Sequence, residues 1–291
     1  MNGIRKSRTT YLLFIAPAFF LFIIFFIIPT IQTFLNSFYY WNGTMARRFA
    51  GLNNFISLFE DKNILMPLRN SLYWIMNSVF IVLPLSFIFA LIIQSKVKGY
   101  RLFRTIFYLP VIISEMAIAI IWGFMFNTQT GVINELLKGI NMESLIQGWL
   151  YDPKIAIFSC LAVNTWAYAS AYMIIYLGEM KSIPEEVYEA ASIDGAMGFR
   201  RVVSITIPMM WDTIKVTVYL SICAGLQQFG LVYGLTGGGP GDSTQTLGTY
   251  MYQLAYRDLY FGYSSVISLL ILIISYAIIT TSNLLMKRQE A

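Results

Sequence analysis

Residues 71–94 read SLYWIMNSVFIVLPLSFIFALIIQ, a stretch of mostly apolar side chains without one Asp, Glu, Lys or Arg. A helix needs about 20 apolar residues, each adding about 1.5 Å of rise, to cross roughly 30 Å of hydrocarbon. This stretch meets that length, and its flanks carry the polar residues that it lacks. It predicts a helix that crosses a membrane.

Five further segments have the same apolar character and nearly the same length. They are Tyr11 to Ile31, Thr105 to Phe126, Ile155 to Leu177, Asp212 to Leu231 and Tyr263 to Met286. The first of these is too long for the apolar region of a secretory signal and is expected to be a retained span. The sequence therefore predicts an all-α membrane protein with six transmembrane helices.

Composition agrees with a membrane protein. Apolar residues make up 57% of the 291 residues and charged residues only 12%, whereas a soluble domain carries about 25% charged residues. The net charge of +5 does not predict nucleic-acid binding, because the basic residues lie at the ends of apolar runs and not on one helix face.

The placement of basic residues predicts the orientation of the chain. Loops on the cytoplasmic side of a membrane are enriched in Lys and Arg. With six spans, most of the 20 Lys and Arg residues fall on one side. These are Arg5, Lys6, Arg8, Lys96, Lys98, Arg101, Arg104, Lys181, Arg200, Arg201, Lys215, Lys287 and Arg288. Both termini are therefore expected in the cytoplasm.

Several kinds of catalytic chemistry lack their usual residues. The chain has no His, and it contains no GxxxxGK[ST] loop for nucleotide phosphates. Its two cysteines, Cys160 and Cys223, lie far apart inside apolar runs, which favours small apolar fillers over a disulfide or metal site. We expect no enzyme activity, and no cofactor bound by this chain.

The loop between the fourth and fifth predicted spans, residues 178–211, has a helix–turn–helix pattern. A capping box from Ser182 to Glu185 predicts the first helix, and Gly195 predicts the turn. A second helix is expected over Met197 to Ile207, closed by Pro208. On this pattern alone, the loop is either a connector at the lipid surface or a docking element for another protein.

The residues of this loop resemble the EAA motif of ABC importer permeases. Glu189-Ala190-Ala191 is followed by Gly195 and then by Ile205-Thr206-Ile207-Pro208, in which Ile207 stands where Leu is usual. The resemblance implies a coupling helix that docks into a cleft of a separate ATP-hydrolysing subunit. The positions that it assigns to coupling are Glu189, Ala190, Ala191, Asp194, Gly195 and Pro208; Phe199 is added as an apolar anchor.

Two exterior stretches are similar to those of the carbohydrate branch of this family, the maltose-type permeases. One is LTGGGP at residues 235–240, and the other is GLNNF at residues 51–55. The resemblance implies one type-1 transmembrane domain over 1–291, with its core at about 70–286, in a bacterial cell membrane. It also implies a second permease subunit, two ATP-binding subunits that use ATP and Mg, an external sugar-binding protein and a carbohydrate substrate.

Polar and aromatic residues within the spans are candidates for a sugar pathway. Asn164, Tyr168 and Tyr172 recur at i, i+4 and i+8, on one face of a helix. The other candidates are Gln227, Gln228, Tyr233 and Glu115. Each could instead hydrogen-bond to a neighbouring helix, and Glu115 could pair with a cation there.

A stand-alone secondary carrier or channel is the alternative function. Such a protein usually needs more spans or an internal duplication, together with ionisable residues in its spans for ion coupling. Only Glu115 fits that requirement. A membrane scaffold without transport is a more distant alternative, because it would not need the polar face of the fourth span.

Overall fold

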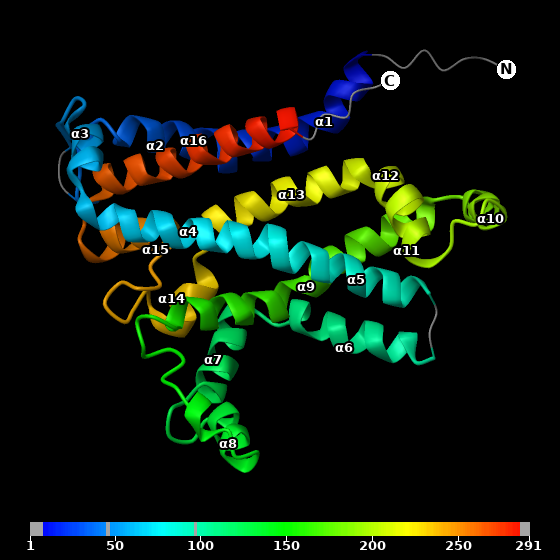
Figure 1. The fold of residues 1–291 in the computed structure, drawn as a ribbon. Helices are drawn as coiled ribbons and strands as arrows, with labels where there is room; N and C mark the ends of the chain where they lie inside the picture. The colour runs from blue at the N-terminus through cyan, green and yellow to red at the C-terminus, as the bar shows by residue number, and fades with distance from the viewer. Residues whose placement is uncertain (1–7, 45–46, 96–97, 286–291) are drawn as a thin grey trace. The chain divides into compact units, whose positions relative to one another are not determined.

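The structure is a computed structural model that describes residues 8–44, 47–95 and 98–285. The basic residues Arg5, Lys6, Lys96, Lys287 and Arg288, and the predicted end of the last span at Met286, lie outside these ranges. The chain is mostly helical, as the composition predicts (Figure 1). It divides into two compact units, Met1–Lys62 with Met251–Leu272, and Asn63–Tyr250 with Ile273–Ala291.

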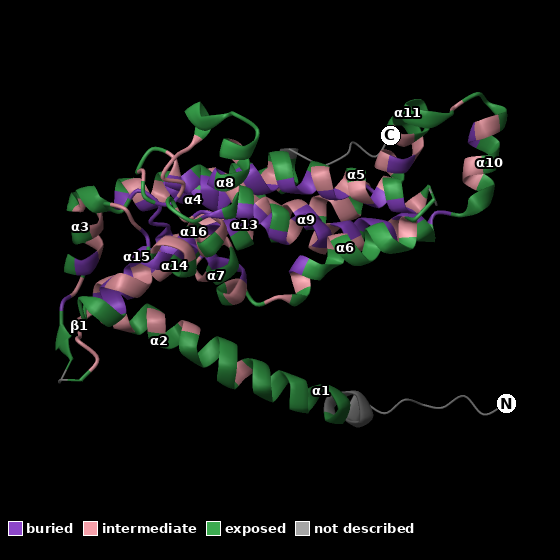
Figure 2. Ribbon diagram, turned by 90° about the horizontal axis from the view of Figure 1, so that it is seen from below, coloured by how far each residue is buried: buried purple, intermediate pink, exposed green. Residues whose placement is uncertain are grey.

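The smaller unit contains a long apolar helix and a short hairpin. The long helix consists of α1 (Arg8–Phe22), a π-helical stretch η1 (Ile23–Ile27) and α2 (Ile28–Asn36), and its outward side chains are exposed along most of its length (Figure 2). The remaining elements are β1 (Tyr39–Tyr40), antiparallel to β2 (Arg48–Phe49), then α3 (Asn53–Glu60), η6 (Gln253–Arg257) and the first part of α16 (Phe261–Leu285).

The amide of Asn54 joins α3 to the start of the hairpin. Its Nδ2 donates to the carbonyl oxygens of Ser37 at 2.8 Å and Tyr39 at 3.0 Å. On the other side of α3, the hydroxyl of Tyr263 donates to Asp61 at 2.7 Å. The Asn54 bonds pair two backbone carbonyl oxygens, and the Tyr263 bond joins α16 to the end of α3.

The larger unit holds the bundle in which the predicted pathway residues lie. Its elements are η2 (Lys62–Ile64, at its edge), α4 (Leu65–Asn77), η3 (Ser78–Val82), α5 (Leu83–Gln94), α6 (Tyr100–Ile112), α7 (Glu115–Met125), α8 (Val132–Gly139), η4 (Glu143–Leu145), α9 (Ala156–Ser182), α10 (Glu185–Ile193), α11 (Gly198–Arg201), η5 (Val202–Thr206), α12 (Ile207–Met209), α13 (Trp211–Leu226), α14 (Gly230–Thr236) and α15 (Leu247–Tyr252). Helix α9 is the centre of this unit, because α4, α5, α6, α13 and α14 all pack against it.

Four continuous helical stretches are long and apolar enough to cross a membrane. They are Leu13–Asn36, Lys62–Gln94, Ala156–Ser182 and Phe261–Leu284. Two bent helix pairs would raise the number to six: α6 with α7, bent by 103°, and α13 with α14, bent by 41°. Among the described residues the spans therefore number four to six, a range that includes the six predicted.

The third and fifth predicted spans are wrong as continuous helices. The third breaks at Ile113, whose backbone is extended, and the hydroxyl of Ser114 then accepts from the backbone N–H of Ala117 to cap α7. The fifth breaks at Gln227–Phe229. Both breaks lie inside apolar sequence, so the apolar pattern alone does not reveal them.

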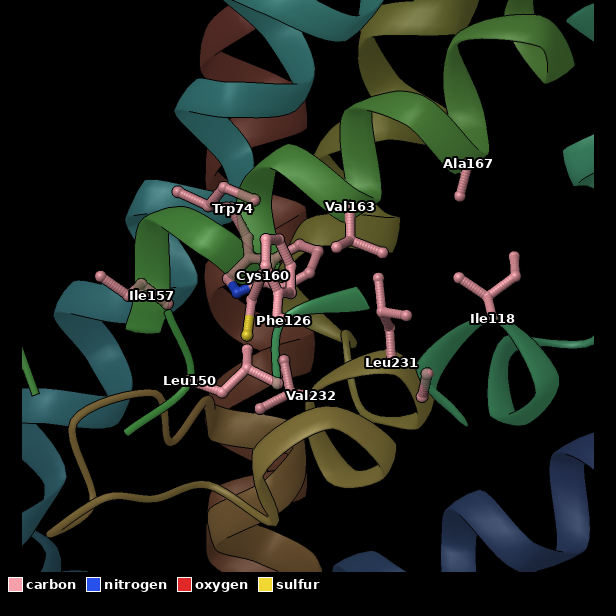
Figure 3. Close-up of a cluster of buried hydrophobic side chains, with 12 residues drawn as sticks. Trp74, Ile118, Phe126, Leu150, Ile157, Cys160, Val163, Ala167, Leu231 and Val232 are labelled. Carbon is pink, nitrogen blue, oxygen red and sulfur yellow. The ribbon is translucent and has the colours of Figure 1, made fainter. Parts of the chain in front are cut away.

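An apolar cluster around α9 fixes the helices that surround it (Figure 3). Trp74 from α4, Cys160 and Val163 from α9, and Leu231 and Val232 from α14 are all buried in it. Within a bilayer, close van der Waals packing of such side chains holds neighbouring helices together, because lipid tails are as apolar as the side chains themselves. Cys160 is buried within the cluster, as expected of a small apolar filler, whereas Cys223 lies outside it and is only partly buried.

Candidate functional site

A cavity of about 260 Å³ lies inside the larger unit, where the broken helix pairs meet α4 and α9. Six of the seven pathway residues predicted from the sequence line it: Glu115, Asn164, Tyr168, Tyr172, Gln227 and Gln228. Helical spacing explains the contribution of α9, because residues four apart lie one above the other on the same face. The cavity wall is thus partly polar.

Glu115 is the first residue of α7 and faces the cavity from the 103° break. The Tyr168 hydroxyl on α9 donates a hydrogen bond to its carboxylate. A negative charge is also favoured at this position by the positive end of the α7 dipole. The ion pairs among the described residues are Lys138–Glu135 and Lys215–Asp212, so the predicted alternative of a cation partner for Glu115 is not seen there.

The break between α13 and α14 brings main-chain groups to the cavity. Gln227, Gln228 and Phe229 form it, and the hydroxyl of Thr246 donates to the carbonyl oxygen of Gln228 at 2.7 Å. Gly230 follows the break, and a β-carbon there would collide with the Glu115 carboxylate. Interrupted helices that line a cavity are how membrane proteins place polar backbone at a solute site.

Among the polar side chains of the cavity, Tyr168 and Glu115 bond to each other between α9 and α7. Other bonds between helices are made outside the cavity: Asn77 with Thr165, and Tyr176 with Thr217 at 2.8 Å. By contrast, no hydrogen bond joins the side-chain amide of Asn164 or Gln227 to another described residue. This arrangement leaves donors and acceptors available for a solute hydroxyl, and it disfavours the alternative of purely structural polar groups.

Several cavity residues carry no signal in the sequence. Besides the predicted set, the cavity is lined by seven residues: Trp74, Ser78, Val82, Ala224, Gly225, Phe229 and Gly230. The indole N–H of Trp74 is buried without a hydrogen-bond acceptor among the described residues. Tyr233, in contrast, lies in α14 outside the cavity lining, with its ring stacked on Phe229 at 5.1 Å.

The second candidate site is the elbow, residues 183–209, which joins α9 to α13. The predicted turn is confirmed: α10 ends at Ile193, Gly195 has φ +74°, and the N–H of Ala196 donates to the Ala191 carbonyl at 2.8 Å. This closing bond and the left-handed residue after the helix are a common way for a helix to end at Gly.

Two local features of the elbow differ from the sequence prediction. The predicted capping box is wrong, because α9 continues to Ser182. The Ser182 hydroxyl donates to the Glu179 carbonyl oxygen at 2.7 Å and does not cap α10. Pro184 precedes α10 and provides no side-chain cap. Pro208 does not close the second helical stretch, since it lies in the first turn of α12, after a π-helical stretch. Proline is tolerated there because no intrahelical N–H is needed.

The elbow has an inner and an outer side. Val187 and Tyr188 pack against a buried cluster of α5 and α9, and Ala191 is buried as well. Arg201 lies over the ring of Tyr188 at 5.3 Å and joins the two arms of the elbow. Glu189, Ala190, Asp194 and Gly195 are exposed.

On the outer side the exposed residues include large apolar ones. Ile193 is 87% exposed, Phe199 83% and Met197 66%. Exposed apolar side chains that gather in one place are typical of a binding surface for another protein. The elbow can therefore anchor to the bundle on one side and bind a partner on the other.

The described residues contain no group of three or more His, Cys, Asp or Glu side chains that could hold a metal ion.

Comparison with known proteins gives a consistent answer. Residues 82–291 match the family described as binding-protein-dependent transport system inner membrane component. The chain is 32% identical to the probable ABC transporter permease protein YurN of Bacillus subtilis, over 94% of this chain and 95% of that protein. It is 34% identical to the lactose transport system permease protein LacF of Rhizobium radiobacter, over 90% of this chain and 88% of that protein.

The fold also matches a solved structure. A chain of the bacterial alginate ABC transporter, solved in complex with an alginate pentasaccharide-bound periplasmic protein, superposes with a TM-score of 0.82. The match covers 95% of this chain and 94% of that chain, at 24% sequence identity. Two chains with such different sequences thus share one helical architecture.

Proposed function

Because this chain belongs to the family of binding-protein-dependent transport system inner membrane components, we propose that it is the permease subunit of an ATP-driven importer that carries a sugar across the membrane. It is a multi-pass inner-membrane protein with several helices long enough to span the bilayer. Relatives that act on lactose and on multiple sugars favour a carbohydrate, most simply an oligosaccharide.

The observation that supports a solute pathway is the cavity itself. It brings Asn164 and Tyr168 of α9 together with Gln227 from the break after α13, and the side-chain amides of Asn164 and Gln227 make no hydrogen bond to another described residue. Amides and aromatic rings match the alternating hydroxyl and C–H faces of a sugar. Weak binding suits a transporter, because the solute must leave on the other side.

In the proposed topology the bent pairs each count as one span, which gives six spans and places both termini and the elbow in the cytoplasm. The elbow then docks into a separate ATP-binding subunit, where ATP and Mg are used, with Phe199 as its apolar anchor. The inner contacts of Val187 and Tyr188 support this role, since they would carry a displacement of the elbow into α5 and α9.

The complete transporter would contain a second, homologous permease, two ATP-binding subunits and an external sugar-binding protein. A single chain with four to six spans lines only part of a two-sided passage, so the second permease would complete it. Transport would proceed by alternating access around the cavity. Residues 1–291 would act as one type-1 transmembrane domain in this assembly.

Replacing Gln227 with Ala is expected to raise the KM for uptake by about 3- to 10-fold and to leave assembly intact. One lost neutral hydrogen bond is worth about 0.5–1.5 kcal/mol, which corresponds to a change of that size. The measurement is uptake of the sugar that the cognate binding protein selects in a ligand screen. Gln129→Ala, at an exposed loop position, is the control and should leave KM unchanged. An unchanged KM for Gln227→Ala would remove this residue from the pathway.

Replacing Phe199 with Ala is expected to weaken binding of the ATP-binding subunit by roughly 30-fold, because an aromatic anchor at the centre of an interface contributes about 2 kcal/mol. The thermal unfolding midpoint of the isolated permease should not change, since the ring is 83% exposed. Co-purification at a series of salt concentrations measures the loss. Phe59→Ala, at an 88% exposed position of α3, is the matched control; equal retention of the subunit by both variants would contradict the docking assignment.

A further inference from the structure

A groove of about 710 Å³ runs along the outer side of α6, away from the pathway cavity. Seven of its lining residues come from α6, and Ile174 of α9 completes it. Arg101 and Arg104 lie at one end of the groove, while Leu109 and Ile112 lie at the other. The groove is therefore cationic at one end and apolar at the other.

The cationic end has no acidic partner among the described residues. Arg101 and Arg104 are exposed and lie one helical turn apart, and the ion pairs of the described ranges involve neither. The Nε of Arg101 donates only to the Tyr100 hydroxyl, at 3.3 Å. Both guanidinium groups also lie near the start of α6, where the helix dipole adds positive potential. An anion is needed to balance this end.

The apolar end is suited to hydrocarbon. Leu109 is 53% exposed and Ile112 is 72% exposed. Tyr108 lies between the two ends and is partly exposed, as an interfacial tyrosine often is. From Arg101 to Ile112 the helix rises about 16 Å, close to half of the roughly 30 Å thickness of a bilayer core.

We propose that this groove is a binding site for one anionic phospholipid of the cytoplasmic leaflet. The lipid phosphate lies between the guanidinium groups of Arg101 and Arg104, which can each donate two parallel hydrogen bonds to it. The acyl chains follow Leu109 and Ile112 along the rest of the helix. Basic grooves at the cytoplasmic ends of spans are recognisable lipid headgroup sites.

The proposal rests on the proposed function in one respect, because it needs the amino end of α6 at the cytoplasmic surface. A lipid at this place would hold α6 against α9 next to the 103° break, and Glu115 of the pathway lies directly after that break. The bound lipid is therefore expected to affect the transport rate as well as stability.

The test measures lipid retained by the purified transporter complex after detergent exchange, with phosphatidylglycerol and phosphatidylcholine offered in equal amounts. The wild-type complex is expected to retain phosphatidylglycerol at least about 5-fold over phosphatidylcholine at low salt, and less so at 1 M salt, because screening weakens contacts with exposed charges. Excess inorganic phosphate should not displace the lipid, since phosphate lacks the acyl chains.

The double variant Arg101→Gln with Arg104→Gln should lose this preference, and Arg101→Lys with Arg104→Lys should keep most of it. If the Gln variant fails to assemble, the Lys variant and the phosphate competition still test the site. Arg47→Gln with Arg48→Gln, which removes the same charge from the first loop, is the control and should behave as wild type.

Equal retention of both lipids by the wild type, or an unchanged preference in the Gln variant, would overturn the proposal. Displacement by phosphate alone would also overturn it, as would occupation of the groove by a helix of the second permease. Lipid retention is measured without transport, so failure of the lipid site would leave the proposed sugar uptake untouched. If the wild-type complex retained the lipid but took up no sugar, only the proposed function would be contradicted.

Discussion

Replacing Gly230 with Ala is expected to reduce solute uptake more than 10-fold, although the change adds a single carbon atom. The new β-carbon would collide with the Glu115 carboxylate, which is held by the Tyr168 hydroxyl. The carboxylate is the far end of a flexible side chain, so it can move away at less than the about 1–3 kcal/mol that overpacking a rigid core costs. Its displacement changes the wall of the cavity, because Gly230 and Glu115 both line it.

The new β-carbon meets one side chain, that of Glu115, which gives the experiment an internal control. Shortening that partner in the double variant Gly230→Ala with Glu115→Ala should restore the thermal unfolding midpoint lost in Gly230→Ala, because the remaining Glu115 β-carbon is 3.6 Å away. Gly123→Ala on α7, where a β-carbon meets no atom within 4 Å, should not lower stability. Normal uptake by Gly230→Ala would show that the carboxylate does not occupy this position.

Replacing Asn70 with Ala is expected to lower the free energy of unfolding by about 2–4 kcal/mol, the second large effect. The Asn70 side chain is fully buried, and its Nδ2 donates to the carbonyl oxygens of Ser243 at 2.8 Å and Gln245 at 2.9 Å. Removing it breaks both of these buried hydrogen bonds, and each such loss costs about 1–3 kcal/mol. The thermal unfolding midpoint in detergent measures the effect.

The same variant should release the segment that Asn70 holds. Residues 243–246 are buried, and the N–H of Leu247 also donates to the Ser71 hydroxyl at 3.0 Å. Limited proteolysis should therefore cut near this segment in Asn70→Ala before it cuts the wild type. Asn53→Ala, at an exposed position of α3, is the control. Equal midpoints for the two variants would show that the segment is held by other contacts.

The sequence predicts the four continuous apolar helices and the polar face of α9 well, for a simple reason. Both depend on local patterns: length of apolar sequence for the spans, and spacing of i, i+4 and i+8 for Asn164, Tyr168 and Tyr172. These patterns can be seen in the sequence however the helices pack against one another. The structure accordingly places all three residues in one cavity wall.

The breaks and the buried segment could not be predicted in the same way, because they depend on contacts between distant residues. The break at Gln228 is satisfied by Thr246, and the segment 243–246 is held by Asn70, more than 170 positions away. In the sequence, this segment follows a glycine run and resembles an ordinary exterior loop. Tertiary hydrogen bonds to its backbone make it part of the core instead.

The start of the elbow shows how a local signal can be overridden. Ser182 and Glu185 have the spacing of a capping box, yet α9 extends through Ser182. The burial of Met180 and Ile183 in the cluster shared with α5 accounts for this extension. Packing of apolar side chains here outweighs a cap that is worth about 1 kcal/mol.

The proposed coupling requires that the outer side of the elbow faces the cytoplasm and contacts an ATP-binding subunit. A single cysteine at position 199 (Phe199→Cys, with Cys160→Ala and Cys223→Ala) tests both points with a maleimide that cannot cross membranes. We predict labelling in inside-out vesicles that contain the permease alone, and protection when the ATP-binding subunits are produced with it. Labelling in sealed right-side-out vesicles, or equal labelling with and without those subunits, would contradict the account.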